Sequence, residues 1–455
     1  MLSVLFYVAF CALCSVLAFV RHPIWGMYFY LATIFVHPPS RWWGYMLPDL
    51  RWALLSALVT ALAIAFHRGR LATKPLWLAS GPAVLLTTYA VWMWIQTPWA
   101  LDPDEHLRGS VQFTKYLVAY WFVYRLADTK EGIRNMLFAL VLGCGILGLI
   151  AMGTGRVGGR LDGVGGPGMD DANTLGMVLA TGAMAGFVLL LTQRGRMRWV
   201  VLAALGLIGQ GFVLANSRGA FLGLAVGGLM IALTKAREHR QRFWVIAAIA
   251  LVGFAIVVDK TFVERMFTIG DVTAESEEAD MSARSRKAIL EAQLQMALDY
   301  PAGVGFRGTV PISPKYLDEQ WLAKLAEGGD QEAGRSSHNT FMTAWVEQGI
   351  PGAVIFLSLV LWGLLAGLRL RRMNDAGGDV ELVTLGSGAF GALGVVLVAG
   401  LATDYLMAEV QFWLLAALVS VLQIGVGPSR QSVRPTAGAH SVPGTSLIES
   451  QSSAR

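Results

Sequence analysis

Apolar runs of about 13–22 residues recur along most of this chain and alternate with short polar segments. A helix needs about 20 apolar residues to cross the hydrocarbon core of a bilayer, so each run is a candidate membrane span. The run at 24–37 is short and can pair with the first run as a shallow hairpin, so we predict about 12 spans, with a range of about 11–13. The candidate spans are 2–20, 24–37, 52–67, 76–97, 111–127, 133–153, 174–192, 199–215, 219–235, 243–259, 350–370, 382–402 and 405–425.

The composition agrees with this pattern. Hydrophobic residues make up 55% of the chain and charged residues only 15%, whereas soluble domains carry about 25% charged residues. The net charge of +5 comes from short basic clusters between apolar runs, as expected of membrane proteins. We therefore predict an all-α polytopic membrane protein that contacts membrane lipids and binds no nucleic acid.

Lysine and arginine concentrate in alternate loops, and this bias predicts the orientation of the chain. The basic loops, which we place in the cytoplasm, are 67–74, 125–134, 194–198, 235–242 and 369–372. The loops that are acidic or poor in basic residues, which we place outside, are 102–106, 153–173, 216–219 and 260–338. The first two apolar runs leave open the side on which the N-terminus lies.

The segment 260–338 is the one long polar stretch between spans, and we predict that it forms a large outward loop with short helices. Helical periodicity covers 282–301 and stops before Pro301, and 316–326 predicts a second short helix. The expected organisation is membrane helices in 1–259, the loop in 260–338, membrane helices in 339–426 and a tail in 427–455. The tail is rich in Ser, Pro, Gly and Thr, which predicts a disordered cytoplasmic segment.

Cationic residues gather on the predicted outward side. Arg218 lies in a tight turn between apolar runs, where it needs an anionic partner or snorkels to lipid phosphates. Arg160 lies in a glycine-rich run whose backbone N–H groups can approach an anion, or which is simply a flexible loop. Arg284 and Arg286 open the predicted loop helix and suit forked phosphate binding, or form a solvated basic face.

Three further polar residues belong to the same side. Lys115 follows an acidic outward loop and can add positive charge to the cluster. Asp171 and Asn173 stand at the start of a predicted span, where one of them can serve as its N-cap. Several cations on one membrane face together favour a site for a lipid-linked phosphate or pyrophosphate.

His338 ends the long polar stretch and stands directly before an apolar segment. A histidine titrates near neutral pH and can take a proton from a hydroxyl group. Capping of the following helix is the alternative, because Asn339 and Thr340 come next. No second His or Cys stands at metal-ligand spacing, so we expect no metal, and the C-x-x-C pair Cys11 and Cys14 fits two small residues on one helix face.

The order of these short motifs resembles the O-antigen ligase/polymerase family. The early stretch 21–46 also resembles a branch described as exosortase-associated O-glycosylation ligases. The pieces that carry the resemblance are Ser217-Arg218-Gly219, Arg286 before Pro301-Ala302-Gly303-Val304-Gly305, His338-Asn339 with Glu347, Gly349 and Gly352, and Asp171-Ala172-Asn173.

The resemblance implies a fold similar to that of the large glycosyltransferases that use lipid-linked donors. It also implies an activity, the transfer of a glycan from undecaprenyl pyrophosphate to a hydroxyl of the lipid A–core oligosaccharide. The reaction is expected to be inverting, to need neither metal nor cofactor, and to occur at the periplasmic face of a Gram-negative inner membrane. Arg218 and Arg286, with Arg160 as a helper, would stabilise charge on the leaving pyrophosphate.

Two questions about function stay open in the sequence. His338 can be the base that deprotonates the acceptor, or it can bind the phosphate while Asp171 or Glu347 acts as the base. An O-antigen polymerase or a protein O-oligosaccharyltransferase would use the same donor with another acceptor. A transporter of lipid-linked sugars is the alternative from another class, although the predicted spans carry almost no buried charge along a path across the membrane.

Overall fold

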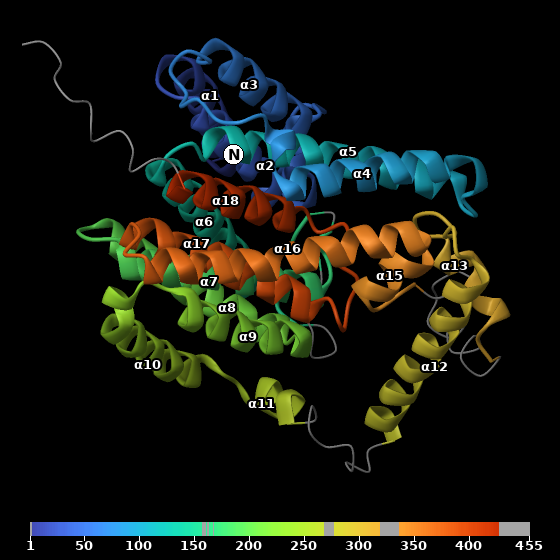
Figure 1. The fold of residues 1–455 in the computed structure, drawn as a ribbon. Helices are drawn as coiled ribbons and strands as arrows, with labels where there is room; N and C mark the ends of the chain where they lie inside the picture. Colours follow the sequence, from blue (N-terminus) through green and yellow to red (C-terminus); the bar gives the residue numbers. More distant parts are fainter. Residues whose placement is uncertain are drawn as a thin grey trace, which may run out of the picture. The chain divides into compact units, whose positions relative to one another are not determined.

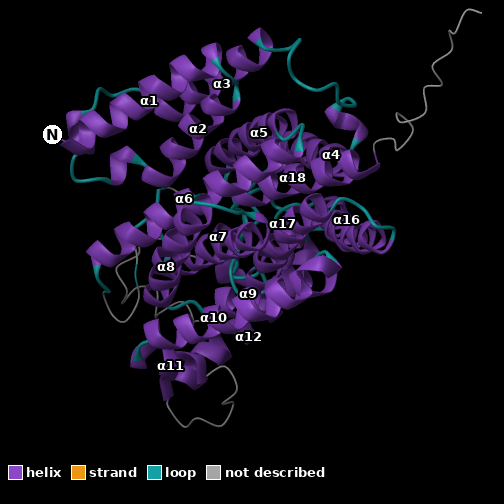
Figure 2. Ribbon diagram, turned by 90° about the vertical axis from the view of Figure 1, so that its left-hand side faces the viewer, coloured by secondary structure: helices purple, strands orange, loops and turns teal. Residues whose placement is uncertain are grey.

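The computed structural model describes residues 2–156, 161, 163–166, 168–267, 277–318 and 336–426, with the side chains of 267, 277–286 and 426 left out. Every predicted span corresponds to a helix, and the described residues contain no strand (Figures 1 and 2). The helices of the first half are α1 (Leu2–Val20), α2 (Ile24–Val36), α3 (Trp52–Phe66), α4 (Gly81–Gln96), α5 (Pro103–Leu126), α6 (Lys130–Thr154), α7 (Ala172–Thr192), α8 (Met197–Ala215) and α9 (Arg218–Thr234). The helices of the second half are α10 (Arg240–Val257), α11 (Lys260–Phe267), α12 (Glu277–Asp299), α13 (Thr309–Ile312), α15 (Thr340–Val346), α16 (Gly349–Asp375), α17 (Val380–Ala399) and α18 (Glu409–Val426). Short 3-10 turns connect several of them, namely η1 (Pro38–Ser40), η2 (Gly44–Met46), η3 (Trp77–Ala79), η4 (Thr97–Trp99), η5 (Arg237–His239) and η6 (Ser313–Lys315).

The chain is a polytopic helical membrane protein. Seven of the described helices are long and apolar enough to cross a bilayer, and three shorter apolar helices, Trp52–Phe66, Arg218–Thr234 and Glu409–Gly425, accompany them. Several helix starts differ from the edges of the apolar runs. The polar segment 102–106, predicted to be a loop, belongs to α5, because Asp102 caps the helix through the Glu105 N–H and Pro103 suits its first turn.

The centre of the bundle is formed by α7 and α17, which are buried along most of their length. These helices pack against each other and against α9, and α6 and α8 close the other side of α7 (Figure 1). Glycines allow this close approach: a Cβ at Gly227 would lie 2.6 Å from the Gly391 carbonyl oxygen, and one at Gly391 would lie 2.7 Å from the Gly227 carbonyl oxygen. Small residues at helix crossings are typical of membrane bundles, where packing replaces the hydrophobic effect.

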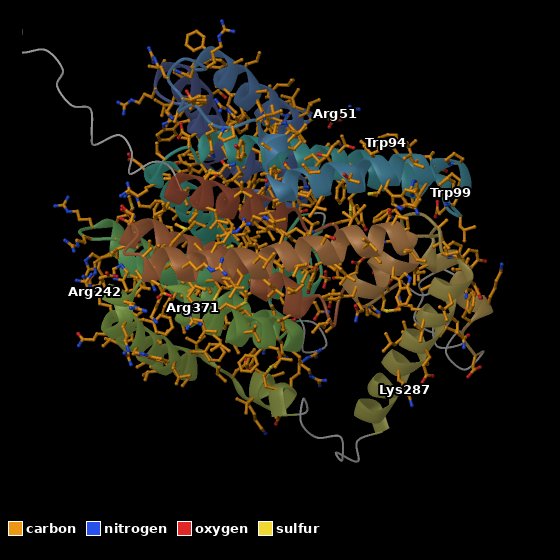
Figure 3. All side chains as sticks on the ribbon, viewed as in Figure 1. Arg51, Trp94, Trp99, Arg242, Lys287 and Arg371 are labelled. Atoms are coloured by element: carbon orange, nitrogen blue, oxygen red, sulfur yellow. The ribbon has the colours of Figure 1, made fainter. Side chains whose placement is uncertain are left out.

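The two ends of the bundle differ in chemistry. Arg242 and Arg371 lie at one end, whereas Trp94, Trp99 and Lys287 lie toward the other (Figure 3). The second end also carries α15 and the start of α16, and we call it the α15 end. The predicted helix at 282–301 is present as α12, which packs against α15. The second predicted loop helix, 316–326, and the tail 427–455 lie mostly or wholly outside the described residues.

Candidate functional site

The first turn of α15 is fixed by the residue after His338. Asn339 is the N-cap: its side-chain oxygen accepts from the N–H groups of Phe341 (2.9 Å) and Met342 (3.2 Å). The alternative that His338 caps this helix is therefore wrong, because Asn339 is the N-cap of α15. His338 is exposed directly before the cap, so its imidazole lies at the rim of the α15 end.

The turn between α17 and α18 holds this helix start in place. The Thr340 N–H donates to the Gly400 carbonyl (2.8 Å), and the Thr340 hydroxyl donates to the Thr403 carbonyl (3.0 Å). The same hydroxyl accepts from the N–H of Tyr405 (2.8 Å). The Asn339 amide adds a bond to the Leu401 carbonyl (3.2 Å). Residues 337–340 are thus docked on residues 400–405, which are about 60 positions later in the chain.

The starts of α7 and α9 meet beside this turn. Asp171 caps α7 by accepting from the N–H groups of Asn173 (2.8 Å) and Thr174 (3.1 Å) and from the Thr174 hydroxyl. Ser217 caps α9 and donates its hydroxyl to the Asn173 side-chain oxygen (3.2 Å). Tyr405 lies near Asp171 and shares a hydrogen bond with Thr174. Three helix N-termini, each with a partial positive charge, therefore surround one turn.

Arg218 is the first residue of α9 and is half-buried. Its Nε donates to the carbonyl of Arg265 in α11 (3.0 Å), so α11 orients the guanidinium group. The start of α11 is held in turn by an ion pair between Arg156 and Asp259 (2.6 Å). Phe262 of the same helix is buried in a cluster with Phe212, Phe221 and Phe254.

Two of the glycine motifs pack directly against each other. Gly303 and Gly349 both have positive φ angles, +80° and +65°, which glycine adopts without strain. A Cβ at Gly303 would lie 2.5 Å from both the Glu347 carbonyl oxygen and the Gly349 nitrogen. Backbone bonds from Val304 N to Val346 O (3.1 Å) and from Gly305 N to Glu347 O (2.9 Å) join the two segments. The P-x-G-x-G and E-x-G motifs therefore form one structural junction.

Side chains from α4 and α5 form hydrogen bonds with this junction. Gln96 donates to the carbonyls of Ala302 (2.9 Å) and Glu347 (3.1 Å). His106 is fully buried; its Nδ1 accepts from the Phe306 N–H (2.8 Å) and its Nε2 contacts the Met93 carbonyl (2.8 Å). Because the Phe306 N–H donates to Nδ1 and the Met93 carbonyl can only accept, the proton of the neutral imidazole lies on Nε2.

Glu347 places a carboxyl group in the interior of the α15 end. It is 5% exposed, and its Oε1 accepts from the Thr309 hydroxyl (3.1 Å), whereas its Oε2 has no hydrogen-bond partner among the described residues. Burial, and next the nearby charge of Asp404, raise the pKa of Glu347 to about 8. At neutral pH this side chain is therefore mostly protonated.

Asp404 is the second carboxyl of this region and was not among the predicted site residues. It is half-buried, and its side chain accepts from the Leu406 N–H (2.9 Å) and from the Thr343 hydroxyl. Burial raises the pKa of Asp404 to about 6. Arg307, also absent from the prediction, donates its backbone N–H to Glu347 and lies near both carboxyls; its φ of +59° is unusual for a residue with a side chain.

An apolar cavity lies within the bundle and has Thr340 in its wall. Its volume is about 890 Å³, including space open to solvent, and it is lined by α4, α5, α9, α15, α16, α17 and α18. Tyr89, Thr340 and Gln411 are the polar residues of its wall, and Thr340 stands two positions after His338. The apolar lining residues include Leu86, Phe113, Met230, Phe341, Phe356, Val360, Phe390, Leu393, Leu397 and Leu415.

The other predicted site residues are not joined to this cluster. Lys115 is exposed on α5, a helix that packs mainly against α2, α3, α4 and α6. Arg284 and Arg286 belong to α12, but their side chains lie outside the described residues, as does the whole of Arg160. Among the residues that the structure describes, no group of three His, Cys, Asp or Glu side chains could hold a metal ion.

The fold and this cluster define a polytopic helical membrane protein with polar side chains gathered at the α15 end and an apolar cavity within the bundle that Thr340 helps to line. Residues 203–357, about a third of the chain, match the family described as O-antigen ligase. This match supports the predicted resemblance to that family, and it indicates an enzyme family related to glycosyl transfer. The match contains Arg218, Arg286, His338, Asn339 and Glu347. No curated protein matches the chain.

Proposed function

We propose that this protein transfers a glycan from undecaprenyl pyrophosphate to a hydroxyl group of the lipid A–core oligosaccharide, at the periplasmic face of a Gram-negative inner membrane. One observation carries the proposal beyond the family match: Thr340, two positions after His338, lines the apolar cavity and also contacts the 400–405 turn, beside which α7 and α9 begin. A donor that joins an apolar tail to an anionic head needs such an arrangement. In this proposal part of its tail occupies the cavity, and its pyrophosphate faces positive helix ends.

Charge stabilisation is assigned to the arginines. Negative charge develops on the pyrophosphate as the bond from its oxygen to the anomeric carbon breaks, and a fixed guanidinium group stabilises that charge. Arg218 suits this role because α11 orients it through the Arg265 carbonyl (3.0 Å). Arg286 and Arg160 are proposed as partners, with Arg284 as a further phosphate ligand.

His338 is proposed as the base. The acceptor hydroxyl loses its proton to the imidazole while its oxygen forms the bond to the anomeric carbon, and the electron pair of the old bond leaves with the pyrophosphate. Two rivals are less suited to accept the proton. Asp171 uses its carboxylate to cap α7, and Glu347 is mostly protonated at neutral pH because burial raises its pKa to about 8.

The test is a reconstitution of the purified protein with a lipid-linked glycan and three acceptors in parallel. The acceptors are lipid A–core, a second lipid-linked glycan and a pilin-like protein, and glycan transfer is followed by gel shift. Transfer to lipid A–core alone is expected. Transfer only to one of the other acceptors would instead identify a polymerase or a protein oligosaccharyltransferase, and movement of the donor across the bilayer without transfer would identify a transporter.

Variants then test the roles of single residues. His338→Ala is expected to lower kcat by about 10²–10⁴-fold, the usual contribution of a general base. Arg218→Ala is expected to lower it by about 10²–10³-fold, as for the loss of one preorganised charge donor. Arg242→Ala, an exposed arginine at the opposite end of the bundle (Figure 3), is the matched control and retains activity. Full activity of His338→Ala would refute the base assignment.

A further inference from the structure

The stretch after α2, residues 37–46, has no part in the transfer chemistry proposed above, yet it is tightly built. Two 3-10 turns, η1 and η2, are joined by bonds from Arg41 N to Pro38 O (2.9 Å) and from Gly44 N to Arg41 O (2.8 Å). Gly44 contacts the Pro38 carbonyl so closely that no Cβ fits there. These contacts hold the loop in a compact double turn.

Two large aromatic residues point away from this loop. Trp42 is 71% exposed and Tyr45 is 80% exposed, whereas Trp43 between them is buried against Tyr7, with ring centres 5.7 Å apart. Tyr7 also packs edge-on against Trp52 of α3 (5.5 Å). The buried tryptophan therefore anchors the loop and leaves the two exposed rings fixed at its surface. We call Trp42 and Tyr45 the aromatic platform.

The loop that carries the platform is joined by direct contacts to the segment before Asp171. Arg41 donates to the carbonyls of Val36 (2.8 Å) and Val164, and the His37 ring packs on Gly166, where a Cβ would lie 2.5 Å from its Cγ. The loop that contains Val164 and Gly166 leads into Asp171, the cap of α7. Within that loop Gly163 donates to the Asp170 carbonyl (2.6 Å). The loop that carries the platform thus contacts the segment that leads into Asp171.

We propose that the aromatic platform binds the pyranose rings of a glycan substrate as it enters or leaves the site, an inference that rests on the proposed function. The face of an aromatic ring is negative and the C–H groups of a sugar face are weakly positive, so the two stack. Exposed Trp and Tyr side chains supply large, rigid and amphipathic contact area at low entropic cost. A fluid lipid headgroup layer gains nothing from a fixed loop, whereas a stereochemically defined ligand gains affinity from preorganisation.

The experiment measures glycan binding without transfer, so its outcome is separate from that of the proposed function. The purified full-length protein in nanodiscs is titrated with two probes. One is the O-polysaccharide released from the source strain's lipopolysaccharide by mild acid, and the other is core oligosaccharide from a strain without O-polysaccharide. The first represents the glycan of the donor and the second that of the acceptor. Trp42→Ala, Tyr45→Ala and the conservative Trp42→Phe are compared with Trp244→Ala, another exposed tryptophan, which lies on α10 (60% exposed).

Trp42→Ala and Tyr45→Ala are each expected to weaken binding of one probe by about tenfold, with Trp42→Phe near the wild type and Trp244→Ala unchanged. The probe that responds identifies the substrate. Equal affinities in all variants for both probes would overturn the proposal. It would also be overturned if brominated phosphatidylcholine quenched the emission of Trp42, obtained as the difference between wild type and Trp42→Phe, while glycan affinity stayed unchanged, because the platform would then be a membrane anchor.

Discussion

The junction between Gly303 and Gly349 allows a quantitative test by a single methyl group. In Gly303→Ala the new Cβ would lie 2.5 Å from the Glu347 carbonyl oxygen and the Gly349 nitrogen and 2.6 Å from the Gln348 carbonyl carbon. These are backbone atoms of the segment that begins α16, so no rotation of a side chain can relieve the contact. The alanine would also have to adopt a φ of +80°.

The magnitude follows from three contributions to the free energy of unfolding. The left-handed backbone costs an alanine about 1–2 kcal/mol, and forcing an extra methyl into a packed site costs about 1–3 kcal/mol. Separation of the segments weakens the bonds of Val304 to Val346 and of Gly305 to Glu347, each worth about 0.5–1.5 kcal/mol. We expect a total loss of about 3–6 kcal/mol, large against the usual marginal stability of a fold.

Two other glycines separate these contributions. Gly195 has a φ of +70°, but a methyl group added there would meet no atom within 4 Å, so Gly195→Ala carries the backbone cost alone, about 1–2 kcal/mol. Gly228 lies within α9 with no atom that close, so Gly228→Ala is expected to be neutral or to stabilise by up to about 1 kcal/mol. The assay is thermal unfolding of each purified variant, followed by tryptophan emission.

The expected order of unfolding temperature is Gly228→Ala at or above the wild type, then Gly195→Ala, then Gly303→Ala. Gly303→Ala should lower the unfolding temperature by at least twice as much as Gly195→Ala. If Gly303→Ala unfolded at the same temperature as Gly195→Ala, the close approach of the two segments would be refuted. Backbone strain alone would then explain the result.

Three more predictions concern carboxyl groups and their partners. Burial raises the pKa of Glu347 from 4.5 to about 8, so the folded state keeps a proton that the unfolded state releases; stability should fall as pH rises from about 4.5 to 8. Glu347→Gln should flatten the unfolding temperature over that range, and an unchanged slope would contradict the assignment. Asp259→Asn removes the partner of Arg156, so the amides of α11 should exchange hydrogen about five- to thirtyfold faster while those of α7 stay unchanged, a loss of about 1–2 kcal/mol of local stability. Tyr30→Phe removes the hydroxyl that donates to Glu409 (2.5 Å) and should cost about 1–3 kcal/mol by thermal unfolding. Combining it with Glu409→Gln should cost less than the sum of the two changes, and strict additivity would show that the bond does not matter.

The membrane class and the positions of the helices were predictable from local pattern. A run of apolar residues must satisfy its backbone hydrogen bonds internally inside a bilayer, so it forms a helix wherever it occurs. Boundaries were less predictable because polar capping residues extend a helix beyond its apolar part. The acidic segment at 102–106 shows this, since Asp102 caps α5 several residues before the apolar run begins.

The site was predictable only in part. Asp171 and Asn339 stood in the sequence as polar residues before apolar runs, and the structure shows both as caps. Asp404 is also a polar residue beside an apolar run, because it lies between the last two predicted spans. Its proximity to Glu347 was not predictable, since the two residues are far apart in the sequence. Arg307 was not predictable, because its role follows from a backbone conformation and not from its residue type.

Three properties could be predicted from the sequence alone: the all-helical membrane class, the order of the spans and the resemblance to the O-antigen ligase family. These properties depend on hydrophobicity and on short motifs, which act within a few turns of chain. Tertiary structure alone decided that residues 337–340 dock on 400–405, that Gly303 packs on Gly349 and that Glu347 is buried beside Asp404. These contacts join segments about 45–65 residues apart in the sequence. They depend on which helix ends meet when the bundle packs, and the periodicity of apolar residues within one helix does not predict this.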